Sequence, residues 1–227
     1  EKPLSDNLRN TEKLLEIAQK KKLIVLVGCN LRFHPSIVLI RNMILQETLG
    51  KIISTHVENG SFLPNWHPNE NYRTNYAARN DLGGGVVLTC IHEIDYLYWF
   101  FKKISEVFSI TGKFSDLKIN TDDLSVILMK VGKNSVAEIH LDYFQQPTQR
   151  SCKIIGTNGT LIWDSRSNSI NFYDNIKKKW SILLKLAKFD YNQMYVDELS
   201  HFIDCIKCKK ASINPISDGI KILKIAL

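Results

Sequence analysis

Six short segments of strand character follow one another between residues 105 and 174, and they limit the possible folds more than any other feature. They read SEVFSITGKF, DLSVILMKV, SVAEIHLDYF, RSCKIIGT, GTLIWD and SINFYD. Asn158-Gly159, between the fourth and the fifth, is a strong hairpin signal. Consecutive strands joined by tight turns pair with their neighbours in antiparallel fashion. We therefore expect an antiparallel sheet of about five or six strands.

Helical patterns surround this series. Apolar residues recur at helical spacing over 6–22, 35–50 and 81–101 before it, and over 191–210 and 217–227 after it. Residues 51–62 alternate as a further strand, and the apolar run LIVLVG at 23–28 is typical of a strand covered on both faces. Segregated helices and strands predict an α+β fold, in which a mainly antiparallel sheet carries helices on one face; that this sheet is open is what the family resemblance described below implies.

Composition narrows the partners and the compartment. The 227 residues carry a net charge of +7, largely from lysine runs at 20–22, 177–179 and 207–210. No nucleic-acid-binding motif accompanies these runs, so solvated turns and helix ends are the better interpretation. Five cysteines without framework spacing, and no long apolar span, predict a reducing cytoplasm and no membrane partner. Cys205 and Cys208 lack the second pair of a zinc site, and we expect one helix with one sulfur inward and no metal.

The segment DLGGGVVLTCIHEIDYLYWFF, residues 81–101, places polar side chains in an apolar helix. Thr89, His92 and Asp95 recur at three-residue intervals and would share one side of that helix. One interpretation is a core histidine held by Asp95. The other is a general base, because a neutral imidazole can accept a hydroxyl proton near neutral pH. Residues 63–80 are polar, aromatic and irregular, which favours a functional loop.

Taken in order, these motifs resemble the Gfo/Idh/MocA family of NAD(P)-dependent oxidoreductases. The resemblance rests on EKP at 1–3, VGCNLRFHP at 27–35, the Trp-His-Pro loop at 66–68, GGGVVLTCIHEIDYL at 83–97 and the two terminal helices. It implies two domains, with residues 1–29 the terminal helix and strand of a dinucleotide-binding Rossmann domain. Residues 30–227 would be a substrate-binding and dimerisation domain whose open sheet forms a homo-oligomer.

The resemblance also implies roles for individual residues. Lys2 would lie near the nicotinamide and orient the reacting oxygen, and His92 would be the general base toward a sugar hydroxyl. Asp95 would support the site. The implied substrate contacts are Asn30, Arg32, Trp66, His67, Tyr72 and Arg73, and the implied cofactor contacts are Lys2, Pro3 and Arg32. The implied cofactor is NAD or NADP, and the implied substrate is a sugar with a secondary alcohol.

Two departures from the family pattern leave alternatives open. Thr89 stands where family members carry an aspartate, and threonine cannot supply the negative charge that raises a histidine's basicity. The chain also contains no G-x-G-x-x-G fingerprint, so we expect that it does not bind NAD(P) alone. A cofactor domain would have to come from the same gene or from a separately encoded Rossmann half. The alternative function is a non-catalytic remnant or a dimerising interaction module from a split or decayed gene.

Overall fold

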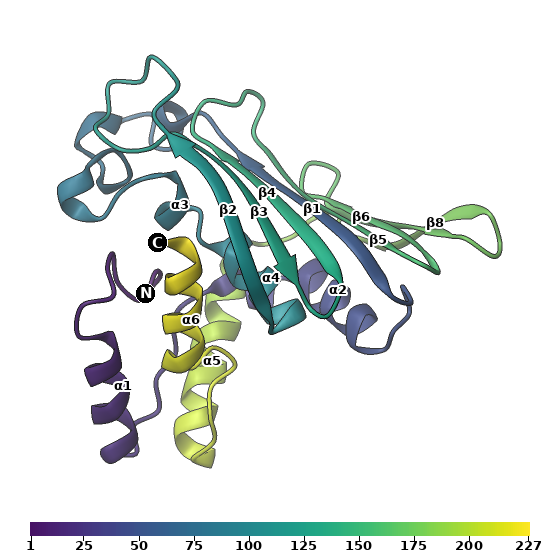
Figure 1. Ribbon diagram of the computed structural model, residues 1–227, viewed down its shortest axis with the longest axis horizontal. Helices are drawn as coiled ribbons and strands as arrows, with labels where there is room; N and C mark the ends of the chain where they lie inside the picture. Colours follow the sequence, from purple (N-terminus) through teal and green to yellow (C-terminus); the bar gives the residue numbers. More distant parts are fainter.

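One eight-stranded sheet organises the computed structural model, which describes all residues 1–227 (Figure 1). The strand order is β2-β3-β4-β1-β5-β6-β7-β8. The strands are β1 (Ile52–Gly60), β2 (Ile104–Gly112), β3 (Leu124–Val131), β4 (Ser135–Asp142), β5 (Gln149–Gly156), β6 (Gly159–Asp164), β7 (Ser169–Asp174) and β8 (Lys179–Lys185). All neighbouring pairs are antiparallel except β1 and β4. The predicted α+β fold with an open, mainly antiparallel sheet is confirmed.

Two strands extend the predicted series. β1 lies between β4 and β5 and runs parallel to β4, with Val57 opposite Ile139. β8 is an edge strand directly after a lysine run, and the sequence pattern did not reveal it because most of its side chains remain exposed. The hairpin predicted at Asn158-Gly159 joins β5 to β6, where Ile155 pairs with Thr160.

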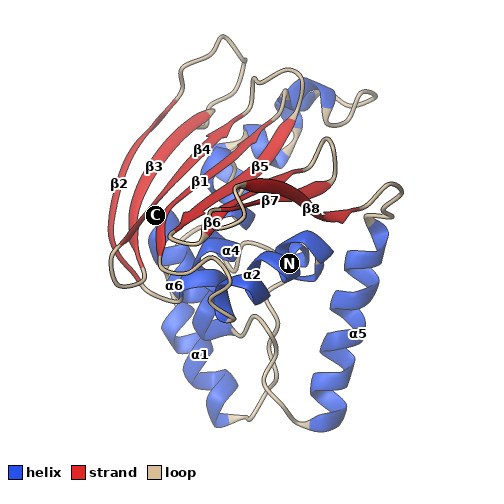
Figure 2. Ribbon diagram, turned by 90° about the vertical axis from the view of Figure 1, so that its right-hand side faces the viewer, coloured by secondary structure: helices blue, strands red, loops and turns tan.

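The helices lie on one face of the sheet (Figure 2). They are α1 (Thr11–Lys20), α2 (Pro35–Leu45), α3 (Val86–Thr89), α4 (His92–Phe101), α5 (Asn192–Cys208) and α6 (Ile216–Ala226). Alternate strand residues such as Ile127, Ile139 and Ile154 are buried with Ile94 and Leu97 of α4 in one hydrophobic core. None of the helices is long and apolar enough to cross a membrane.

The single helix predicted over 81–101 is interrupted, which corrects the expectation that Thr89, His92 and Asp95 share one helix side. α3 ends at Thr89, and α4 starts at His92. The glycines before α3 are required by close backbone approach. A Cβ on Gly84 would overlap the carbonyl oxygens of Tyr76 and Arg79, and Gly85 has φ +115° beside Asp122.

The run LIVLVG forms no strand, although its composition predicted one. It has no neighbouring strand within this chain. The backbone is instead held by the turn before α6, where Val27 N–H donates to Asn214 O at 2.9 Å and Asn214 Nδ2 donates to Val27 O at 3.1 Å. Leu23 is 58% exposed, so the run is not covered on both faces.

A buried ion pair joins the first third of the chain to α4 and α6. Arg32, in the 3-10 turn Asn30–Phe33, donates from Nε and Nη2 to the two carboxylate oxygens of Asp95 at 2.9 and 2.8 Å. Its Nη1 donates to Ile213 O at 2.7 Å, and Asn214 Nδ2 donates to Asp95 Oδ1 at 3.2 Å. Both charged side chains are at most 1% exposed, so each neutralises the other inside the core.

Removing one partner of this pair should destabilise the whole fold. We expect Asp95→Ala to lower the free energy of unfolding by about 3–5 kcal/mol, because the buried guanidinium of Arg32 would lose its two-point partner and keep only Asp218, whose carboxylate lies 4.0 Å from Nη1. Urea denaturation followed by circular dichroism measures the difference. The matched control is Asp81→Ala, which breaks the exposed Arg79–Asp81 pair and should leave the unfolding midpoint unchanged. Equal midpoints for the two variants would contradict the assignment.

Candidate active site

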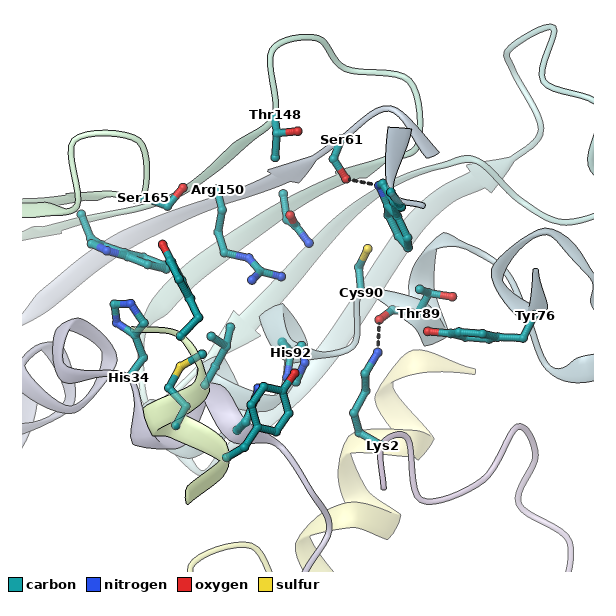
Figure 3. A pocket seen from close by; sticks show the side chains of 18 residues that line it. Lys2, His34, Ser61, Tyr76, Thr89, Cys90, His92, Thr148, Arg150 and Ser165 are labelled. Atoms are coloured by element: carbon teal, nitrogen blue, oxygen red, sulfur yellow. Dashed lines mark hydrogen bonds between the residues drawn. The ribbon is translucent and has the colours of Figure 1, made fainter. Parts of the chain in front are cut away.

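A cavity of about 510 Å³ opens between the sheet and the helices that cover it (Figure 3). Arg150, Thr148 and Ser165 face it from the sheet side, and Lys2, His92 and His34 face it from the helical side. The remaining lining residues are Asn30, Leu31, Asn59, Ser61, Trp66, Tyr76, Thr89, Cys90, Trp163, Tyr191, Met194 and Tyr195. Residues from every third of the chain therefore meet in one hollow.

Lys2, Thr89 and His92 form one end of this cavity. Lys2 Nζ donates to the carbonyl oxygen of Thr89 at 2.5 Å, a carbonyl at the end of α3 that the helix break leaves free of a helical partner. His92, the first residue of α4, follows after Cys90 and Ile91. The interruption of the helix thus brings a cation and an imidazole to the same wall.

Burial controls the protonation of these groups. Burial holds the pKa of His92 well below its usual value, and the positive charges of Arg150 and Lys2 lower that pKa further. Burial also lowers the pKa of Lys2. The His92 imidazole is therefore neutral at neutral pH, and its Nδ1 is buried without a protein partner. Burial raises the pKa of the neighbouring Cys90 thiol to about 12, so that thiol is un-ionised.

Arg150, which lines the cavity, forms a second charged pair with Glu93, which is buried behind it. Arg150 Nε lies 2.9 Å from Glu93 Oε1, and Asn59 Nδ2 donates to Glu93 Oε2 at 3.2 Å. Burial raises the pKa of Glu93, and the charge of Arg150 acts in the opposite direction. Three elements, β5, α4 and β1, thereby hold the guanidinium in place.

Aromatic rings close the other end. His34 caps α2 by accepting the Ser36 N–H at Nδ1, with a distance of 3.1 Å. Its ring lies 5.5 Å from the Trp163 ring and 6.1 Å from the Tyr191 ring, centroid to centroid. Burial lowers the pKa of His34 to about 4. This neutral ring belongs to an apolar wall of the cavity.

The structure brings together five of the residues singled out from the sequence. Lys2, Thr89, His92, Asn30 and Trp66 all line the cavity. The Trp66 indole is oriented by a hydrogen bond from Nε1 to Ser61 Oγ at 2.7 Å. These residues come from segments that lie up to 90 positions apart, so only the fold creates their proximity.

Other expected site residues lie elsewhere. Arg32 was expected to contact substrate and cofactor and Asp95 to hold His92, but these two side chains neutralise each other in the core and do not line the cavity. His67 is exposed. Tyr72 and Arg73 point to the far side of the loop, where the Lys118 N–H donates to Tyr72 Oη at 3.2 Å and Arg73 lines a separate hollow.

Pro3 and the cysteine pair of α5 also lie outside the cavity. Pro3 is half-buried next to Lys2 and does not line the cavity. Cys205 is buried and Cys208 is exposed, which confirms the single inward sulfur predicted for this helix.

Sequence reasoning missed the central pair. Glu93 was overlooked because it stands outside the spacing of the Thr89 stripe, and the helix break changes which side chain faces the sheet. Arg150 is one of thirty basic residues in the chain, and its local sequence, QQPTQRS, contains no motif. Arg150 itself pairs with Asn59 across β1 and β5, and this could not be known before the β1–β5 register.

The central part of the chain identifies its family. Residues 37–162 match the sequence model of the GFO/IDH/MocA C-terminal domain, a span that covers more than half of the chain. The protein therefore belongs to the Gfo/Idh/MocA oxidoreductase family, as its motifs predicted.

Solved structures share this fold at low sequence identity. Levoglucosan dehydrogenase in complex with NADH and levoglucosan is 14% identical with a TM-score of 0.86, over 99% of this chain and 68% of that one. The UDP-N-acetylglucosamine 3-dehydrogenase GnnA from Acidithiobacillus ferrooxidans is 18% identical with a TM-score of 0.78, over 99% and 66%. An oxidoreductase domain protein from Kribbella flavida is 16% identical with a TM-score of 0.85, over 99% and 68%. This chain thus spans about two thirds of their length.

The buried His34 should make stability depend on pH. In the unfolded chain a histidine takes up a proton near pH 6.5, whereas the folded ring does so only at about pH 4. Between these values the unfolded state binds more protons, so we expect the free energy of unfolding to fall as the pH falls from about 6.5 to about 4. His34→Asn, which keeps a capping acceptor, should flatten this slope in urea titrations at several pH values. An unchanged slope would mean that His34 is protonated in the folded chain.

Proposed function

We propose that this chain is the substrate-binding part of an oxidoreductase that transfers a hydride between a secondary alcohol of a sugar and NAD or NADP. The observation that carries the proposal is the meeting of Lys2 and His92 in one cavity. A desolvated ammonium and a neutral imidazole that line the same cavity can hold the oxygen of a reacting hydroxyl and accept its proton. The neighbouring folds named for sugar dehydrogenases agree with this choice of substrate.

Each group has a distinct task. His92 accepts the proton of the reacting hydroxyl, since its imidazole is neutral at neutral pH. Lys2 holds the oxygen of that hydroxyl, and its ammonium favours negative charge as it develops there. Asn30 and Trp66 contact the sugar from the cavity wall. The dinucleotide, when bound, supplies the carbon that accepts the hydride.

The domain assignment is part of this proposal. Residues 1–29 belong with a dinucleotide-binding domain, and residues 30–227 form the substrate domain. Support comes from apolar side chains that this chain leaves uncovered on two helices below the sheet. Leu14 and Ile17 of α1 are 48% and 40% exposed, and Leu199 and Ile203 of α5 are 59% and 42% exposed. Such apolar surfaces mark a contact with another domain.

Removing the proposed base tests the reaction. In a polypeptide that joins this chain to its cofactor domain, we expect His92→Ala to lower kcat by about 10²–10⁴-fold, since general-base catalysis contributes that much. The absorbance of the NAD(P)H that forms measures the rate with sugars as substrates. Affinity for the dinucleotide should change little.

Two further variants sharpen the result. Thr89→Asp should raise the rate if the missing carboxylate limits the basicity of His92. Lys133→Ala, at an exposed position in the turn between β3 and β4 and outside the cavity, is the control and should keep the wild-type rate. Near-normal turnover in His92→Ala would contradict the assigned base, and no turnover in the unaltered protein would favour a non-catalytic module.

We also propose that the open face of the sheet forms a homodimer. On this face, Phe108 and Ile110 of β2 are 68% and 70% exposed. They pair with Leu128 and Val126 of β3, which are 46% and 38% exposed. A contiguous apolar face of this kind is a signature of a protein–protein interface.

A charge placed on this face should prevent association. We expect the wild-type chain to sediment as a dimer and Leu128→Glu to sediment as a 26.1 kDa monomer, because a carboxylate in the interface would lose its water. Analytical ultracentrifugation distinguishes the two masses. Ile176→Glu, in the turn between β7 and β8, makes the same kind of change outside the face and should remain dimeric. A monomeric wild-type chain would contradict the interface.

A further inference from the structure

The cavity carries more positive than negative charge. Lys2 and Arg150 line it, and no aspartate or glutamate does. The carboxylate paired with a lining cation is Glu93, which is completely buried behind Arg150. His34 and His92 add no charge at neutral pH because burial lowers both pKa values. The balance of one uncompensated positive charge favours a ligand that brings a negative one.

Arg150 has unused hydrogen-bonding capacity toward the cavity. A guanidinium carries five N–H donors. Its Nε faces Glu93 Oε1 at 2.9 Å, and neither terminal nitrogen donates to a protein acceptor within hydrogen-bonding distance. The side chain is 27% exposed although its partner Glu93 is fully buried. Figure 3 shows the guanidinium suspended from the sheet side above His92, with its terminal end in the hollow.

Arg32 shows how an arginine with a purely structural role is bound in this protein, and it can be compared with Arg150. Its Nε and Nη2 both donate to Asp95, its Nη1 donates to Ile213 O, and its side chain is 0% exposed. All three nitrogens of Arg32 are therefore occupied by the protein. Arg150 differs because its Nε is ion-paired with Glu93 Oε1 at 2.9 Å without a hydrogen bond, and none of its nitrogens donates to the protein, so the fork of its terminal nitrogens remains available to a ligand.

The available fork is held rigidly. Arg150 extends from β5, and Glu93 behind it is held in turn by Asn59 from β1, the strand paired with β5. A planar, preorganised guanidinium binds the two oxygens of a carboxylate or a phosphate through parallel hydrogen bonds. A neutral hydroxyl cannot use both donors in this way.

We propose that Arg150 determines specificity by binding an oxyanion of the substrate through its terminal nitrogens, so that the preferred substrates are acidic sugars. The oxyanion is a carboxylate or a phosphate ester, whose chemistry toward the guanidinium is the same. The inference rests on the proposed function, because the same cavity contains Lys2 and His92 at the reacting hydroxyl. One small molecule spans the two sites.

Binding measurements test this without any hydride transfer. Trp66 and Trp163 line the cavity, so tryptophan fluorescence reports occupancy. The ligands are D-glucose, D-glucuronate and D-glucose 6-phosphate at constant ionic strength. We expect at least one acidic sugar to bind about ten- to a hundredfold more tightly than glucose, the range for a hydrogen-bonded charged group. Tighter glucuronate binding identifies a carboxylate, and tighter phosphate binding identifies a phosphate ester.

Variants assign the preference to Arg150. Arg150→Lys keeps the charge but lacks the fork, so the preference for the acidic sugar should fall about tenfold. The double variant Arg150→Gln with Glu93→Gln avoids leaving a buried carboxylate unpaired, and should bind glucose and the acidic sugar equally. Lys153→Gln is the matched control, since Lys153 is exposed on the same strand and should keep the full preference.

The outcomes separate this inference from the proposed reaction. Equal binding of all three ligands by the wild-type chain, or no saturable binding of any, overturns the role of Arg150. A preference that survives in the double variant also overturns it. If the preference is present and depends on Arg150 but no sugar is oxidised, the oxyanion site stands and the proposed reaction fails.

Discussion

The buried pair of Arg32 and Asp95 is the interaction on which the rest of the structure depends. Arg32 lies in the turn before α2, Asp95 lies in α4, and both are bound to the turn at 213–214 before α6. Three segments that are far apart in sequence therefore meet at the Arg32–Asp95 pair. Leaving either of these charges unpaired in the core would be costly. This junction sets the position of α4, and α4 begins with His92.

The candidate active site is built on the same junction. Because Asp95 is occupied by Arg32, it is not available to His92, and the carboxylate that pairs with a cavity arginine is Glu93, the partner of Arg150. One helix, α4, thus has one carboxylate that organises the fold and another that holds a cavity arginine. The break between α3 and α4 leaves the Thr89 carbonyl at the end of α3, where it accepts a hydrogen bond from Lys2.

Much of the fold was predictable because its signals are local. The alternation of β3, with Ile127 and Met129 buried and Leu128 exposed, is a period-two pattern visible in the letters. The prediction of a strand at 23–28 was wrong for the opposite reason. A strand forms only beside a neighbouring strand, and an apolar run does not reveal whether this chain supplies that neighbour. The break at Cys90 was also hidden, because helical spacing continues across it.

The sequence by itself determined the succession of strands and helices and the resemblance to a family, since residue type and order are sufficient for these, and that resemblance named Lys2 and His92 as candidates. Only the tertiary structure decided which side chains meet. It assigned Arg32 to Asp95, and it joined Arg150 to Glu93 across a sheet whose register no local pattern encodes. The physical reason is that buried charges select their partners by position in space, and that position depends on the packing of the whole chain.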